Sequence, residues 1–163
     1  MSNQTPPSSG PAVSRCRWAE THPLLRTYHD EEWGVPVHDS RMLWEMLMLE
    51  GFQAGLSWLT VLRRREGFRK AFAGFDPEQV ARFDEADVER LLNDRGIIRA
   101  RAKIQATIGN ARAYLAMQAS GEDFAIFCWG MVPGAGVENK TVEVLAQCPA
   151  SHGLARALNE LGL

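Results

Sequence analysis

The sequence predicts an all-α protein folded as a single globular domain, and three observations support this prediction. Apolar residues recur at helical spacing along most of the chain, whereas no convincing stretch alternates apolar and polar residues as a strand would. The length of 163 residues is that of one domain. A hydrophobic content of 45% is enough for a sizeable core, and no repeat or linker divides the chain.

Three helical segments are expected in the first half. Asp39 and Ser40 are suitable N-cap residues for the first of them. Its apolar positions recur at helical spacing and are Met42, Leu43, Met46, Leu47 and Leu49. A second apolar and basic stretch covers residues 58–72. Asp76 followed by Pro77 predicts a short capped helix with proline in its first turn.

The second half predicts a helix over residues 84–93 and a break after it. A long helix follows over residues 99–117. Its inward positions are Ile104, Ile108, Ala111 and Leu115. A short aromatic element at 124–129 comes next, and then two short helices at 142–145 and 154–161.

The N-terminal residues 1–14 are rich in Ser, Pro, Asn and Gln and contain no apolar segment of the kind found in secretory signals. They are expected to be a disordered lead-in to a helical domain over 15–163. Charges interrupt every apolar run, so no membrane span is expected.

Charge and cysteine content narrow the function classes. Eighteen Lys and Arg against 20 Asp and Glu give a net charge of −2, which excludes a protein coated in basic charge but not one with a local nucleic-acid-binding patch. Three cysteines, Cys16, Cys128 and Cys148, do not form a disulfide framework and predict a reducing cytoplasm. Cys128 lies in an aromatic run and is expected to be buried and unreactive.

A basic helix pair around Gly96 is a candidate DNA-binding motif. Two helices meet at the turn that contains Gly96, and Arg99, Arg101 and Lys103 follow it. Backbone N–H groups at a helix N-terminus, with positive charge beside them, suit a DNA phosphate. The alternative is an ordinary helix break with solvated basic residues.

Aromatic residues crowd the first third of the chain around one carboxylate. The residues are Trp18, Tyr28, His29, Trp33, Glu50 and Trp58. Aromatic faces stack on flat bases and attract cationic ones, and a carboxylate on an apolar helix face requires a hydrogen-bond donor. These residues therefore suit a slot for a planar, electron-poor ligand. The alternative is a core of large aromatics in which Glu50 caps a turn.

Read together, these segments resemble the 3-methyladenine DNA glycosylase I family, a helix-hairpin-helix group of DNA glycosylases. Long matches run in order from Cys16 to about Trp129. They are residues 28–36 (YHDEEWGVP), 50–58 (EGFQAGLSW), 96–99 (GIIR), 103–105 (KIQ) and 108–113 (IGNARA).

The resemblance implies a monofunctional enzyme that flips 3-methyladenine out of double-stranded DNA and hydrolyses its glycosidic bond in base excision repair. Glu50 would hydrogen-bond the base, and Tyr28, Trp58, Trp33 and Trp18 would line and stack on it. Leu56, beside Gly55, would fill the gap in the duplex, and the hairpin around Gly96 with Arg99, Arg101 and Lys103 would contact phosphates. The enzyme would act as a monomer.

The same resemblance implies a structural zinc held by two Cys and two His. Cys16 and His29 match the first pair, and the segment that carries the second pair is expected to be absent beyond Leu163. Cys148 and His152 are an alternative second pair, in reverse order and too early in the chain. Two ligands do not make a closed tetrahedral site.

Two other functions remain open. One is a weakly active or inactive DNA-damage-binding module of the same family, and base release distinguishes it from an enzyme. The other is a protein-interaction domain in which the aromatic residues form a groove for a partner, and salt-dependent affinity for DNA would be evidence against it.

Overall fold

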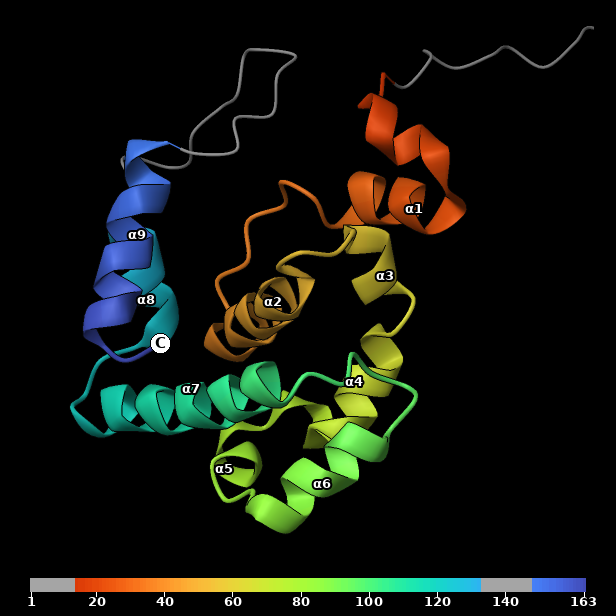
Figure 1. Cartoon of the computed structure of the whole chain (residues 1–163). Coiled ribbons are helices and arrows are strands. Elements are labelled where there is room, and N and C mark those ends of the chain that lie inside the picture. The colour runs from red at the N-terminus through yellow and green to blue at the C-terminus, as the bar shows by residue number, and fades with distance from the viewer. Residues whose placement is uncertain (1–13, 133–147) are drawn as a thin grey trace, which may run out of the picture. The chain divides into compact units, whose positions relative to one another are not determined.

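The computed structural model describes residues 14–132 and 148–163, and its chain divides into two compact units, Met1–Val35 and Pro36–Leu163 (Figure 1). Within the described residues the regular secondary structure is helical throughout, which confirms the all-α prediction. Most of the predicted lead-in (1–13) and the predicted helix at 142–145 lie outside the described residues.

The first unit contains the 3₁₀ helix η1 (Arg17–Thr21) and the helix α1 (Pro23–Glu31), which pack against each other. The ring of His22 accepts a hydrogen bond from the Leu24 N–H and caps α1, whose first residue is a proline. Leu25 and Tyr28 are buried on one face of α1.

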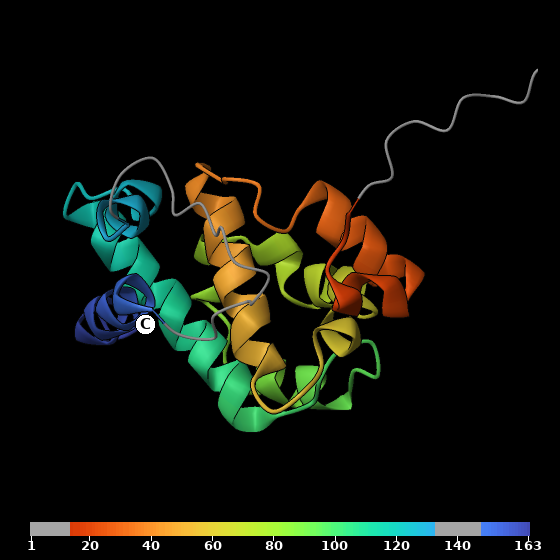
Figure 2. The same cartoon turned by 90° about the horizontal axis from the view of Figure 1, so that it is seen from above.

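The second unit is a bundle of short helices around two long ones. The elements in chain order are α2 (Ser40–Gln53), α3 (Trp58–Leu62), α4 (Arg65–Ala71), η2 (Ala73–Phe75), α5 (Pro77–Val80), α6 (Glu85–Asn93), α7 (Arg101–Ala119), α8 (Phe124–Gly130) and α9 (Pro149–Glu160). The long helices α2 and α7 pack against each other and cross in the view of Figure 2. They form the frame on which the shorter helices pack.

Side-chain caps begin these helices where the sequence predicts them. Asp39 accepts from the N–H of Met42 at the start of α2, and Asp76 caps α5. Asp84 forms a capping box with Asp87 at the start of α6.

The core confirms the predicted inner face of α7 and, on α2, the predicted positions Leu43, Leu47 and Leu49. Ile104, Ile108 and Ala111 are buried. On α2, however, Met42 is 57% exposed, whereas Trp44 is fully buried. Trp44, Met48 and Phe52, spaced four residues apart, define the inward face of α2, so Met42 is turned toward solvent.

The stretch 58–72 is two helices, not one. α3 ends at Leu62, and the N–H of Arg64 donates to the Val61 carbonyl in a tight turn before α4 begins at Arg65. α9 begins earlier than predicted, because Pro149 occupies its first position and Cys148 caps it.

None of the helices within 14–132 and 148–163 is both long enough and apolar enough to cross a membrane.

Candidate functional site

Glu50 lies in the last turn of α2 and carries an electrostatic signature typical of functional carboxylates. Its side chain reaches solvent, yet desolvation by the surrounding protein raises its pKa. No described residue forms an ion pair or a hydrogen bond with its carboxylate. It is therefore a partly desolvated acceptor that is free to bind a ligand.

The chain turns sharply between α2 and α3 and exposes Leu56. Gly55 has φ +81°, a left-handed conformation that favours glycine. The Leu56 N–H donates to the Gln53 carbonyl at 2.6 Å and closes the turn. The Leu56 side chain is 43% exposed, so the turn holds an apolar group in solvent close in sequence to Glu50.

Trp58 follows this turn as the first residue of α3. The hydroxyl of Ser57 accepts from the N–H of Thr60 and caps the helix. The Trp58 indole is half-buried and packs on the hydrophobic core, and α3 packs against α2. Glu50, Leu56 and Trp58 thus lie on one continuous segment of the second unit, which consists of the end of α2, the turn after it and the start of α3.

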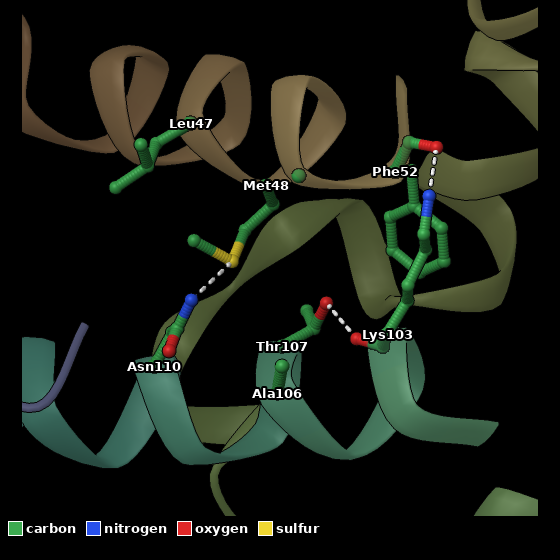
Figure 3. A pocket seen from close by; sticks show the side chains of 8 residues that line it. Leu47, Met48, Phe52, Lys103, Ala106, Thr107 and Asn110 are labelled. Carbon is green, nitrogen blue, oxygen red and sulfur yellow. Dashed lines mark hydrogen bonds between the residues drawn. The ribbon is translucent and has the colours of Figure 1, made fainter. Parts of the chain in front are cut away.

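Lys103, in the first turn of α7, contacts the C-terminal end of α2 in an unexpected role. Its Nζ donates hydrogen bonds to the carbonyl oxygens of Phe52 at 2.8 Å and Ala54 at 2.7 Å; Figure 3 draws the first of these. These carbonyls lie at the C-terminus of α2, where no helical partner exists for them. The ammonium predicted to contact a phosphate is therefore bound to backbone.

Three of the predicted base-binding aromatics lie in the first unit. Trp18 makes edge contacts with Trp33 and His29, each with 5.3 Å between ring centroids, and lies 6.3 Å from Tyr28. His29 stacks on Trp33 at 5.4 Å. The cluster predicted from the sequence is therefore real within this unit, and Tyr28 is its buried member.

The predicted metal ligands Cys16 and His29 lie together in the first unit. The Cys16 N–H donates to His29 Nε2 at 3.4 Å, and His29 Nδ1 lies 3.0 Å from a carboxylate oxygen of Asp30. A carboxylate on one ring nitrogen fixes the orientation of the ring, as it does for histidines that bind metals. No set of three or more His, Cys, Asp or Glu within the described parts of the chain is arranged to hold a metal.

Arg15 completes this network from the other side. It forms a two-pronged ion pair with Asp30. The hydrogen bond from Arg15, and to a smaller extent the one from His29, lowers the pKa of Asp30 to about 2. These contacts tie the segment before η1 to the end of α1.

The other two cysteines have structural surroundings. The Cys148 thiol caps α9 by accepting from the Ser151 N–H, and His152 is exposed in the first turn. Burial, with a smaller contribution from Asp123, raises the pKa of the half-buried Cys128 to about 11. A thiol with so high a pKa is unreactive at neutral pH, as expected.

The segment predicted to form a hairpin comprises α6, residues 94–100 between the helices, and α7. The Asp94 carboxylate accepts from the Gly96 N–H at 2.7 Å and shapes the turn. Ile97 is buried behind it and Ile98 packs on the core. The turn is therefore held by one side-chain cap and by two aliphatic anchors.

Gly67 on α4 touches this turn and was not singled out by the sequence. A Cβ added to Gly67 would overlap the carbonyl oxygen of Gly96. Gly96 has no positive φ, so this turn depends on close backbone packing and not on left-handed freedom. A lone glycine within a short helix gives no signal of such an approach.

The basic residues around the turn differ in availability. Arg101 is ion-paired with both Glu85 and Glu89 across α6. Arg99 is exposed, and no described residue pairs with it. Arg95, which was not predicted as a site residue, is equally exposed and unpaired within the described ranges.

A pocket of about 80 Å³ lies between α2 and α7. It is mostly apolar and is lined by Leu47, Met48, Gly51, Phe52, Lys103, Ala106, Thr107 and Asn110 (Figure 3). A cavity that holds benzene has about 150 Å³, so this pocket is too small for a purine.

Comparison with known proteins gives one consistent result. The family model described as methyladenine glycosylase matches residues 18–163. DNA-3-methyladenine glycosylase 1 of Escherichia coli (strain K12) is 51% identical over 153 residues, which are 92% of this chain and 82% of that protein.

Solved structures agree. A crystal structure of 3-methyladenine DNA glycosylase I superposes with a TM-score of 0.86 at 52% identity and covers 91% of this chain and 84% of its own. A variant of a 3-methyladenine DNA glycosylase I in complex with 3-methyladenine superposes with a TM-score of 0.79 at 34% identity, over 90% of this chain and 81% of its own.

Proposed function

This chain belongs to the methyladenine glycosylase family and excises 3-methyladenine from alkylated DNA, and we propose that Glu50 is the residue that recognises the base. The reaction is hydrolytic: water replaces the base at the sugar carbon, and the C–N bond breaks. The observation that carries the assignment is the unpartnered, partly desolvated carboxylate at the end of α2.

The chemistry of the substrate explains why one carboxylate suffices. Methylation at N3 gives adenine a positive charge, so the base is already a good leaving group. A carboxylate can accept hydrogen bonds from the N–H groups of the base and offset its positive charge. This attraction weakens once the base has left, because the released base is neutral. Glu50 thus stabilises the bound cation and helps to orient it, and stacking contributes the rest of the binding energy.

The aromatic residues take the stacking role in this proposal. Tyr28 and Trp58 bind the faces of the base, and Trp18 and Trp33 form the walls around Tyr28. The contacts of Trp18 support this division, because its ring packs edge-on against Trp33 and lies tilted against Tyr28, so that it helps to hold both rings in place.

The base must leave the duplex before it can be bound, at a free-energy cost of a few kcal/mol. We assign the wedge that fills the vacated space to Leu56, next to Gly55. Its support is the exposed side chain on a tightly closed turn. An alkylated base that pairs weakly is extruded more easily, which adds selectivity.

Phosphate contacts in the proposal come from the turn around Gly96 and from Arg99, to which we add Arg95. Both arginines are exposed and have no described partner. Arg101 and Lys103, which were expected to act in the same way, are engaged by carboxylates and by carbonyls respectively, which favours supporting roles for them.

The test is release of free 3-methyladenine from methylated duplex DNA by this chain and by Glu50→Gln. We expect a loss of about tenfold to a hundredfold, the value of about 1.5–3 kcal/mol that a hydrogen bond to a charged group contributes. The melting temperature of Glu50→Gln should not fall, because the raised pKa means that ionised Glu50 does not stabilise the fold. Full activity in a folded Glu50→Gln would contradict the assignment.

An inactive damage-binding module is not favoured, because the relatives are named as enzymes and Glu50 is present. A protein-interaction domain lacks comparable support. We further propose a monomer that works in the reducing cytoplasm, consistent with three cysteines that form no disulfide. Sedimentation of the purified chain, with and without duplex DNA, tests the monomer.

A further inference from the structure

We propose that Lys103 is a positioning residue for the turn at residues 54–57, and thereby for Leu56, and that it does not bind phosphate. The inference rests on the proposed wedge role of Leu56. Nothing in the sequence distinguishes Lys103 from the basic residues before it, whereas its contacts do.

The ammonium of Lys103 binds the two backbone carbonyls that flank the end of α2. Nζ donates to Phe52 at 2.8 Å and to Ala54 at 2.7 Å, one on each side of the last helical residue, Gln53. Carbonyls at a helix C-terminus carry partial negative charge and lack helical donors. A cation placed on both of them fixes the direction in which the chain leaves the helix.

The lysine itself is rigidly held. It lies in the first turn of α7, next to the fully buried Ile104. Its own carbonyl accepts from the Thr107 hydroxyl at 2.9 Å, and its side chain lines the pocket between α2 and α7 (Figure 3). The turn after α2 is thus connected to α7, which contributes several residues to the core of the second unit.

The turn needs such a support if Leu56 acts as a wedge. Gly55 adopts a left-handed conformation in which it has more freedom than other residues, and Leu56 is exposed. Within the described residues the turn is fixed by the Leu56 N–H bond to Gln53 and by the Lys103 bonds. If the turn were mobile, Leu56 would not stay in the space that the flipped base has left, and the base could return to the duplex. A misplacement of about 1 Å can reduce a rate about a hundredfold.

A phosphate ligand would behave differently in a way that can be measured. Each lysine that neutralises a phosphate releases counterions, so its loss lowers the slope of log affinity against log salt by about one. A lysine that binds carbonyls inside the protein leaves that slope unchanged. Salt dependence therefore separates the two roles.

The experiment compares Lys103→Met, Leu56→Ala and their combination with the parent chain. Lys70→Met is the matched control, because Lys70 is exposed on α4 and has no partner among the described residues. Three quantities are measured: release of 3-methyladenine from duplex and from single-stranded DNA of one sequence, affinity for the free base, and the salt slope of duplex binding.

We expect Lys103→Met and Leu56→Ala each to slow release from duplex DNA about tenfold. Release from single strands, which need no wedge, and affinity for the free base should stay within about twofold. The double variant should be no worse than the worse single variant, since both act through one turn. Lys70→Met should match the parent chain, and the salt slope should be the same in all variants.

A salt slope lowered by about one in Lys103→Met alone would assign the lysine to phosphate and overturn the inference. Equal losses on duplex and single strands, or weakened binding of the free base, would do so too, because Glu50 or the whole fold would then be affected. If Leu56→Ala retains full duplex activity, the wedge role fails and the inference with it. Should Lys103→Met not fold, Lys103→Gln separates the roles instead: it keeps a donor for the carbonyls and removes the charge, so the salt slope should stay unchanged, and a slope lowered by about one would overturn the inference.

Discussion

At the scale of single residues, Glu50 is distinguished by a carboxylate that has no partner among the described residues. Glu50 has only desolvation acting on its pKa, whereas Asp39 caps a helix and Glu45 pairs with Arg69. The sequence indicated that Glu50 would be costly on an apolar helix face, and the structure explains how it is tolerated. It remains in contact with water until a ligand arrives.

The raised pKa of Glu50 predicts the acid side of the pH profile. The base is held by the ionised form, which is lost at a higher pH than for an ordinary glutamate because desolvation raises the pKa. Activity should therefore fall as the pH is lowered through a range above that of a free glutamate side chain. Initial rates of enzymatic base release, corrected for spontaneous release, measure this.

The control is Glu50→Gln, whose residual activity should lack that acid limb. A wild-type acid limb at the pH of an ordinary glutamate would show that the ionisation of another group controls the rate.

Arg99 and Arg101, two residues apart, should respond oppositely to removal. Arg99→Gln is expected to lower the salt slope of duplex binding by about one, because its exposed guanidinium is available to a phosphate. Arg101→Gln should leave the slope unchanged and lower the melting temperature, since it breaks the ion pairs with Glu85 and Glu89. Fluorescence anisotropy across a salt series measures both slopes, and equal slope changes would contradict the distinction.

At the scale of elements, the helix starts follow from local sequence signals, whereas the turns depend on the segments that pack against them. The caps at Asp39, Asp76 and Asp84 were predictable because each cap is a local signal. The break of 58–72 at Arg64 and the contact between Gly67 and Gly96 were not, because they depend on what packs against the segment. The hairpin turn is thus defined by a neighbour that is far away in sequence.

Gly67→Ala should displace the hairpin turn. The added Cβ meets backbone, which has no flexible end to move, so we expect a loss of about 1–3 kcal/mol in the free energy of unfolding. Duplex affinity should fall as well, since the turn around Gly96 shifts. Chemical denaturation and a binding titration measure the two effects.

The matched control is Gly109→Ala in the middle of α7, where a Cβ meets nothing within 4 Å. It should stabilise the protein by up to about 1 kcal/mol through helix propensity. If Gly67→Ala is as stable as Gly109→Ala, the close approach does not constrain the hairpin.

At the scale of the whole molecule, each unit has its own means of cohesion. The second unit has a large aromatic and aliphatic core around α2 and α7. The first unit is small and relies on its aromatic cluster and on the network of Arg15, Asp30 and His29.

Chelation should leave the 163-residue chain intact. Dialysis against EDTA is expected to change neither its melting temperature nor its base release, and metal analysis should find well below one zinc per chain, because the described parts of the chain do not bring three or more His, Cys, Asp or Glu side chains together as metal ligands. About one zinc per chain, lost in Cys16→Ser, would contradict this expectation.

The sequence by itself determined the helical class, most helix starts and the family, because caps, periodicity and contiguous motifs are local properties. It also named the residues that the proposed function uses, including Glu50, Leu56 and Trp58. Only the tertiary structure decided which of the basic residues are available. Lys103 and Arg101 are bound to backbone and carboxylates from other helices, and Arg99 is not. The physical reason is that the availability of a charged side chain to a ligand depends on its neighbours in space, which the order of residues does not record.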